Sequence, residues 1–184
     1  TQRQEYSITS TDQEVAMGRK LAKKVEEEFT LVADPTVQER VKTLGQRVAA
    51  VCERQELVYR FAVVEDDEVN AFSLPGGYVF VNDGLVKKTT SDDELASVLG
   101  HEVAHIAARH AVKRFETSLG AQLVQLASLA SPARAASHGV SIALQASRLA
   151  YARQDELEAD RLSAQYLQKA GFDPKATLSF LETL

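Results

Sequence analysis

Apolar residues recur at helical spacing through the first quarter of the chain. Thr11 to Glu14 has the form of a capping box, so an amphipathic helix is predicted to begin there. Asp34-Pro35 begins a second helix, because Pro is favoured at the first helical position. The apolar stripes are Val15, Gly18, Ala22, Val25 and Phe29, then Val37, Val41, Leu44, Val48 and Val51. Both stripes are typical of helix faces that pack on a core, and neither indicates a cofactor site.

The pattern changes to β-forming residues in the second quarter of the chain. The run 57–64 is rich in β-branched and aromatic residues. Two shorter candidate strands, 70–74 and 78–82, flank a Pro-Gly-Gly turn. These segments predict a small, mainly antiparallel sheet.

Helical spacing returns after the sheet. Ser91 to Glu94 forms a capping box with acidic residues in the first turn, and the helix is predicted to continue to about Arg114. Its apolar positions are Leu95, Val98, Leu99, Val103 and Ile106.

Three further segments complete the chain. An apolar helix is expected to end at Pro132, and the small, polar run 131–139 indicates a loop. A long helix is predicted over about 140–170 and stops at Gly171, a residue suited to the left-handed position after a helix. A final helix is still running at Leu184. The order of elements predicts an α+β fold that is mainly helical.

Composition narrows the class of protein. A chain of 184 residues with 45% hydrophobic and 26% charged residues is expected to form one globular domain over 1–184. Its net charge of −5 argues against a nucleic-acid partner. No uncharged apolar run of about 18 residues occurs, so no membrane-spanning segment is expected within the chain. The single cysteine, Cys52, excludes an internal disulfide and is expected to be a packed thiol.

The sequence His101-Glu102-Val103-Ala104-His105 carries the clearest chemical signal. On a helix, the two imidazoles lie about 40° apart, and Glu102 lies about 60° from His105 on the same side. Both imidazoles can therefore reach one metal ion while the carboxylate flanks it. This is the arrangement that a zinc hydrolase uses to hold a metal ion and deprotonate its water.

A catalytic zinc site needs a third protein ligand, and the helix 140–170 offers one. A stripe on that helix combines apolar and charged residues: Leu149, Arg153, Glu156, Asp160, Ser163 and Leu167. Glu156 is the best third ligand, and Asp160 can accept the free ring N–H of a ligating histidine. Glu158 points about 200° away from Glu156 and is assigned to the solvated face. The alternative is a surface ladder in which Arg153 simply pairs with Glu156 or Asp160.

Three motifs in order give the chain a family resemblance. They are His101-Glu102-x-x-His105, Glu156-x-x-Ala159-Asp160 and the preceding run from Asn70 to Tyr78. Together they resemble the HtpX and CAAX-prenyl-endopeptidase family of zinc peptidases, which are gluzincins. The best match is the soluble bacterial envelope branch that includes the periplasmic BepA-type proteases.

The resemblance implies a zincin-like metallopeptidase domain with one Zn²⁺ per chain. It gives Glu156 the role of third ligand and Asp160 that of its hydrogen-bonding neighbour. It further implies unfolded or misassembled envelope proteins as substrates, envelope-protein partners, and a location in the bacterial periplasm or cell envelope. Envelope relatives often continue with helical repeats, so a continuation beyond Leu184 is expected.

The chemistry implied is metal-assisted hydrolysis of amide bonds, with Glu102 as the general base. The run from Asn70 to Gly77 is the candidate substrate platform, because a strand edge at Asn70, Ala71 and Phe72 can pair with an extended peptide. The alternative for this run is a plain hairpin.

Several other residues could contribute to the site, but the sequence indicates their roles less clearly. His110 lies half a turn from His101 on a straight helix, which favours a structural or supporting role over ligation. His138 lies in the loop 131–139, which is predicted to restrict entry to the cleft; His138 itself either occupies the open metal position at rest or is an ordinary exposed residue. Arg109, Tyr151 and Arg153 are each candidates to stabilise the oxyanion, and the sequence does not choose among them.

Two functions other than a peptidase stay open at this point. One is a zinc-bound chaperone-like or binding module with low or gated proteolysis. The other is an amidase or another hydrolase with the same ligands, since a metal-water site does not reveal its acyl partner. The intact carboxylate of Glu102 favours the enzyme.

Overall fold

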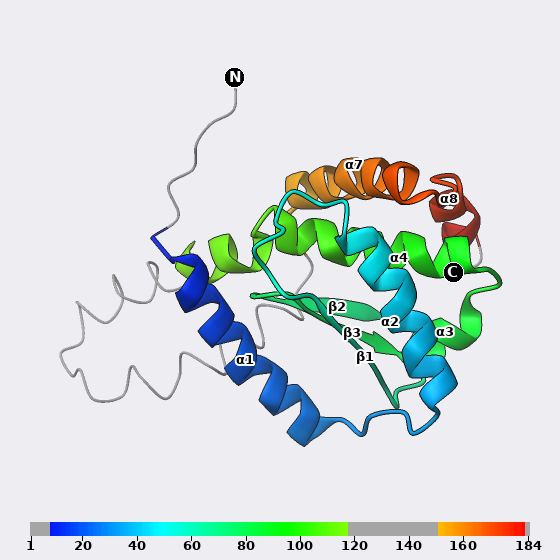
Figure 1. Ribbon diagram of the computed structural model, residues 1–184, viewed down its shortest axis with the longest axis horizontal. Helices are drawn as coiled ribbons and strands as arrows, with labels where there is room; N and C mark the ends of the chain where they lie inside the picture. The colour runs from blue at the N-terminus through cyan, green and yellow to red at the C-terminus, as the bar shows by residue number, and fades with distance from the viewer. Residues whose placement is uncertain (1–7, 118–150, 183–184) are drawn as a thin grey trace.

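The computed structural model describes residues 8–117 and 151–182. Its helices and strands are α1 Thr11–Glu28, α2 Pro35–Ala49, β1 Arg60–Val64, β2 Ala71–Leu74, β3 Tyr78–Asn82, α3 Asp83–Lys88, α4 Asp92–Ala107, α7 Arg153–Ala170 and α8 Ala176–Leu181. Helices surround one small sheet (Figure 1). The predicted α+β class, mainly helical, is confirmed. The loop predicted over 131–139 and the apolar helix before it lie outside the described residues.

Side-chain caps explain where the first helices begin. Asp34 accepts a hydrogen bond from the backbone N–H of Thr36, with Pro35 at the first helical position of α2, as predicted. The capping box of α1, however, is formed by Ser10 and Gln13, one residue earlier than predicted. The shift frees Glu14 to turn inward, where it is only 1% exposed.

The sheet is mixed, with strand order β1-β3-β2. β2 and β3 are antiparallel across the tight turn at Gly76 and Gly77, whose positive φ angles suit glycine. β1 and β3 are parallel. β1 and β2 run in opposite directions, and β3 lies between them, so β3 must run parallel to one of its two neighbours. The expected antiparallel pairing thus accounts for one of the two strand pairs.

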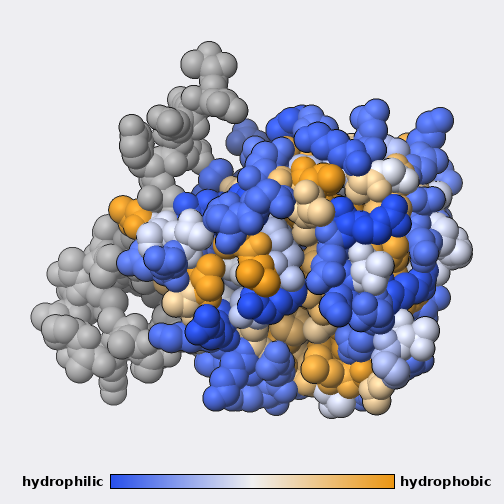
Figure 2. Space-filling view, viewed as in Figure 1, coloured by the Kyte–Doolittle hydropathy of each residue, from blue (hydrophilic) through white to orange (hydrophobic). Residues whose placement is uncertain are grey.

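Helix α4 lies at the centre of the fold. It contacts α2, β2, α7 and α8, and α7 runs along the side of α4 that faces away from the sheet (Figure 1). Leu95, Leu99 and Val103 of α4 are fully buried in the main core. A second cluster packs α1 against the sheet. On the face shown in Figure 2, hydrophobic residues form small groups among hydrophilic ones.

Two predicted helix boundaries are wrong. The helix through Arg114 ends at Ala107, because Arg109 adopts the left-handed conformation (φ 59°), and residues 110–117 form a separate helical segment. The long helix predicted from Val140 is not helical at residues 151–152, and α7 begins at Arg153 after an extended Ala152. Gly171 ends α7 in the left-handed conformation, as predicted. The final helix, α8, ends at Leu181.

Gly18 allows a close approach between α1 and the turn after β2. A Cβ atom at this position would lie 1.8 Å from the carbonyl oxygen of Pro75, which is backbone and cannot rotate away. Gly18→Ala is therefore expected to lower the free energy of unfolding by about 1–3 kcal/mol, although the same change in an open helix would stabilise it. Urea denaturation measures the difference. Lys20→Ala, on the exposed side of α1, should stay within about 0.5 kcal/mol, and a stabilised Gly18→Ala chain would contradict the close contact.

Candidate active site

The two histidines of the predicted motif meet on one side of α4. Nε2 of His101 and Nε2 of His105 are 2.9 Å apart. The side-chain oxygen of Ser91 caps the helix ten residues before His101, so the motif lies within a regular helix. The geometry predicted from the spacing of the two histidines is therefore present.

Glu156 reaches the same point from α7. Its carboxylate oxygens lie 3.3 Å from Nε2 of His101 and 3.7 Å from Nε2 of His105. In the described part of the chain, these three residues form the one group whose ligand atoms lie close enough to share a metal ion. The structure thus brings together the three predicted ligands, although Glu156 lies 55 residues after His101 in the sequence and on a different helix.

The spacing of these atoms fits a zinc ion. Ligand atoms that are about 2.0–2.1 Å from a tetrahedral zinc ion lie roughly 3.3 Å from one another. The three separations observed here are 2.9, 3.3 and 3.7 Å. Two imidazoles and one carboxylate are also a donor set found in catalytic zinc sites, which leave a fourth position open.

Asp160 makes the contact predicted for it. Its Oδ1 atom lies 3.0 Å from Nδ1 of His101. A carboxylate can only accept, so Nδ1 carries the proton and Nε2 is left free to bind a metal. Arg153 is exposed at the start of α7, and among the described residues no ion pair joins it to Glu156 or Asp160. The surface-ladder alternative therefore does not describe this helix.

Glu102 is buried next to His101 in the sequence, beside the three candidate metal ligands, and is 8% exposed. Burial raises the pKa of its carboxyl group to about 7, while the neighbouring His101 and contacts with Ser73 act in the opposite direction. A carboxyl group with this pKa can both accept and release a proton near neutral pH. Ser73 is a buried polar residue of β2 to which the sequence patterns assigned no individual role. The available signal was a single serine inside an otherwise apolar strand.

His105 is also buried, with 2% of its surface exposed. Burial lowers the pKa of its imidazole to about 2, and the neighbouring His101, His110 and Arg114 lower it further. The ring is therefore neutral at physiological pH, as metal binding requires. The ring of Tyr151 stacks on it with 4.0 Å between centroids.

His110 lies next to His105 although the straight-helix argument placed it half a turn away. The break at Arg109 redirects the chain, and Nδ1 of His105 lies 2.8 Å from Nδ1 of His110. His110 is outside the group of ligand atoms. Its Nε2 lies 3.3 Å from a carboxylate oxygen of Glu158. Glu158 keeps 44% of its side-chain surface exposed, so its assignment to the solvated face holds in part, but its contact with His110 was not predicted.

The remaining predicted residues lie around this centre. Tyr151 is at the site, with its hydroxyl buried and without a hydrogen-bond partner among the described residues. Arg109 points instead to Glu14, at 3.1 Å, and to the backbone oxygen of Thr9. His138 lies outside the described residues.

The predicted substrate platform is an edge strand. β2 lies at one side of the three-stranded sheet and contacts α4. Asn70 is exposed just before the strand, Ala71 is half-buried, and Phe72 is buried in a stack with Phe80. Since the side chain of Phe72 faces the core, it is the backbone of β2 that is offered for pairing with a peptide.

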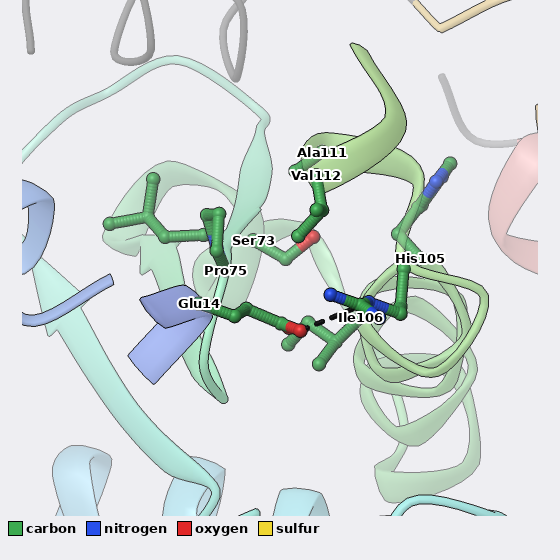
Figure 3. A pocket seen from close by; sticks show the side chains of 9 residues that line it. Glu14, Ser73, Pro75, His105, Ile106, Ala111 and Val112 are labelled. Carbon is green, nitrogen blue, oxygen red and sulfur yellow. Dashed lines mark ion pairs between the residues drawn. The ribbon is translucent and has the colours of Figure 1, made fainter. Parts of the chain in front are cut away.

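A buried carboxylate joins this strand to α4. Glu14 of α1 forms ion pairs with Arg54 and Arg109 and accepts a hydrogen bond from the backbone N–H of Gly76. Glu14, Ser73 and His105 line one small space between α1, β2 and α4 (Figure 3). The Arg109 conformation that directs His110 is therefore held by a contact from the first helix.

The comparison with protein families agrees with this geometry. Residues 35–184 match the family model described as peptidase family M48. The chain belongs to peptidase family M48. The membership confirms the resemblance drawn from the three sequence motifs, and with it the predicted metallopeptidase class.

Curated relatives extend the comparison of this M48 chain. It is 34% identical over 185 residues to the beta-barrel assembly-enhancing protease of Yersinia pestis, covering 95% of this chain and 38% of the relative. The corresponding Escherichia coli (strain K12) protein is 32% identical over 188 residues, covering 97% and 39%. The mitochondrial metalloendopeptidase OMA1 of Schizosaccharomyces pombe is 29% identical over 185 residues, covering 99% and 55%. The chain spans less than half the length of the two bacterial relatives.

The helices that the structure describes in this M48 chain include no candidate for a membrane span. Across residues 8–117 and 151–182, every helix is too short or too polar to cross a bilayer.

Proposed function

We propose that the chain is the catalytic domain of a zinc-dependent endopeptidase. His101, His105 and Glu156 hold one Zn²⁺ per chain. The observation that carries the proposal is the convergence of these three side chains, at separations of 2.9 to 3.7 Å, beside the buried carboxylate of Glu102. Zinc bound there supplies a Lewis acid and a water molecule with a pKa of about 7.

Glu102 acts as the general base in this proposal. Its carboxylate takes the proton of the attacking water and later delivers it to the leaving amine. Burial of this group excludes bulk water, and Ser73 contacts it from β2. His101 and Asp160 keep the ligand geometry fixed while the proton moves.

The edge of β2 binds the substrate as an added strand. An extended peptide that pairs with the backbone at Asn70, Ala71 and Phe72 lies beside α4, because β2 contacts that helix. Backbone pairing selects for extended conformation more than for side chains. Unfolded or misassembled proteins are therefore the proposed substrate class.

The names of the bacterial relatives support an envelope setting. The Yersinia pestis and Escherichia coli proteins are called beta-barrel assembly-enhancing proteases. We accordingly propose envelope proteins as substrates and partners, and the bacterial periplasm or cell envelope as the location. The Schizosaccharomyces pombe relative is called a mitochondrial metalloendopeptidase, so peptide hydrolysis is the element common to these names.

The proposal is tested by two measurements on the same preparation. The purified chain should contain zinc close to one ion per molecule after dialysis, and it should cleave an unfolded protein such as reduced casein. Chelation should stop cleavage, and added zinc should restore it. Zinc at one per chain without cleavage would instead support the binding module, and cleavage of small amides without proteins would support the amidase.

Tyr151 is the oxyanion donor that the structure favours. Its buried hydroxyl has no hydrogen-bond partner among the described residues, whereas Arg109 is paired with Glu14. Removing one donor to a developing oxyanion slows the chemical step. Tyr151→Phe is expected to lower kcat by about tenfold or more with little change in KM or zinc content. Steady-state kinetics measures this, and an unchanged kcat would exclude the role.

A further inference from the structure

We infer that His110 is a positioning residue that fixes the orientation and proton position of the metal ligand His105. The observation is a chain of contacts: Nδ1 of His105 lies 2.8 Å from Nδ1 of His110, and Nε2 of His110 lies 3.3 Å from Oε2 of Glu158. The inference rests on the metal site proposed above. It adds a function for two residues that belong to neither the ligands nor the base.

Counting the protons decides which atom donates in each of these hydrogen bonds. A neutral His105 that binds metal through Nε2 must carry its proton on Nδ1. That N–H can only be satisfied if Nδ1 of His110 accepts it. A neutral His110 then carries its own proton on Nε2, where it faces Glu158 at 3.3 Å and Asp155 at 3.7 Å. Glu158 accepts this hydrogen bond, with the charge of Asp155 nearby, and both ring nitrogens of His110 then have a partner.

The alternative arrangement is incompatible with the metal site. If Nδ1 of His110 carried the proton, Nδ1 of His105 would have to accept it. His105 would then hold its proton on Nε2, the atom that lies 2.9 Å from Nε2 of His101 among the ligand atoms. That nitrogen would have no lone pair for a metal. The carboxylates of Asp155 and Glu158 therefore favour the proton on Nε2 of His110. Through His110 they select the tautomer of His105 that can bind a metal.

The burial of His110 supports this role. The residue is 1% exposed, and its ring lies at 5.0 Å from that of His105. A buried imidazole with both nitrogens hydrogen-bonded is held in one orientation. The ion pair of Arg109 with Glu14 holds the chain break that places it there. His105 is thus clamped between Tyr151 on its face and His110 at its Nδ1 edge.

The test compares two substitutions of His110 by zinc affinity. His110→Leu removes the acceptor and should weaken zinc binding by about 10- to 100-fold, the usual cost of losing a partner of a metal-bound histidine. His110→Asn places an amide oxygen near the Nδ1 position and should recover most of the affinity. Competition with a chromophoric chelator measures both on folded protein, checked by circular dichroism.

A matched control separates this role from simple packing. Val112 is fully buried on the same helical segment, so Val112→Ala should lower the melting temperature without changing the zinc affinity. If His110→Leu and Val112→Ala weaken zinc binding equally, or if His110→Leu leaves it unchanged, the inference is overturned while the metal site stands. Failure of the native chain to bind zinc would overturn the metal site itself and the inference with it.

Histidine tautomers provide an independent readout. The zinc-loaded chain labelled with ¹⁵N at its four histidines should show His105 protonated at Nδ1 and His110 at Nε2 in long-range ¹H–¹⁵N spectra. Assignment follows from His110→Asn. A proton on Nδ1 of His110 would overturn the inference.

Discussion

Glu102→Gln is expected to bind one zinc ion per chain and to hydrolyse peptides at least about a hundredfold more slowly than the native chain, the usual contribution of a general base. The substitution keeps the size of the side chain but removes its capacity to take a proton. Zinc content is expected to persist because Glu102 is not among the three grouped ligand residues. The measurements are metal analysis after dialysis and single-turnover cleavage of a fluorogenic peptide.

Glu94→Gln is the matched control for this prediction. Glu94 is a buried carboxylate on the same helix, where it contacts Thr90 and Ser179 rather than the metal ligands. The same chemical change there should leave turnover close to native. Native turnover in a zinc-replete Glu102→Gln chain would refute the proposed base.

Glu156→Gln is expected to lose its zinc on dialysis and its peptidase activity with it. The amide oxygen is neutral and a much weaker zinc ligand than a carboxylate, and only two imidazoles would remain. Glu158→Gln provides the comparison two residues along α7. Its amide oxygen can still accept from Nε2 of His110, so this chain should keep zinc near one per molecule. Equal loss of zinc in the two variants would contradict the assignment of the third ligand.

Local sequence patterns predicted which side chains meet at the proposed metal centre. The spacing of His101 and His105 fixes their shared helix face wherever that helix packs. The stripe on the later helix selected Glu156 and Asp160 in the same way, and both lie at the expected contacts. The predicted contacts are present because they depend only on the regular spacing of residues along one helix and on the packing of one helix face against another.

Predictions that assumed a regular helix beyond its true end failed. A straight helix would place His110 half a turn from His101, but α4 ends at Ala107 and Arg109 redirects the chain. This change of direction is linked to an ion pair with Glu14, 95 residues earlier in the chain. The contact between His110 and Glu158 escaped prediction for the same reason. The parallel pairing of β1 with β3 likewise could not be predicted, because it depends on β3 lying between β1 and β2.

The sequence by itself predicted the grouping of His101, His105 and Glu156 and determined the mainly helical α+β class, because helical periodicity and capping act over a few residues. Only the tertiary structure decided the burial that raises the pKa of Glu102, the contact of Ser73 with it, and the partner of Nδ1 of His105. Those features need segments from α1, β2, α4 and α7 to pack together. Contacts that depend on packing between segments, or on a break in a helix such as that at Arg109, leave no periodic signal in the sequence.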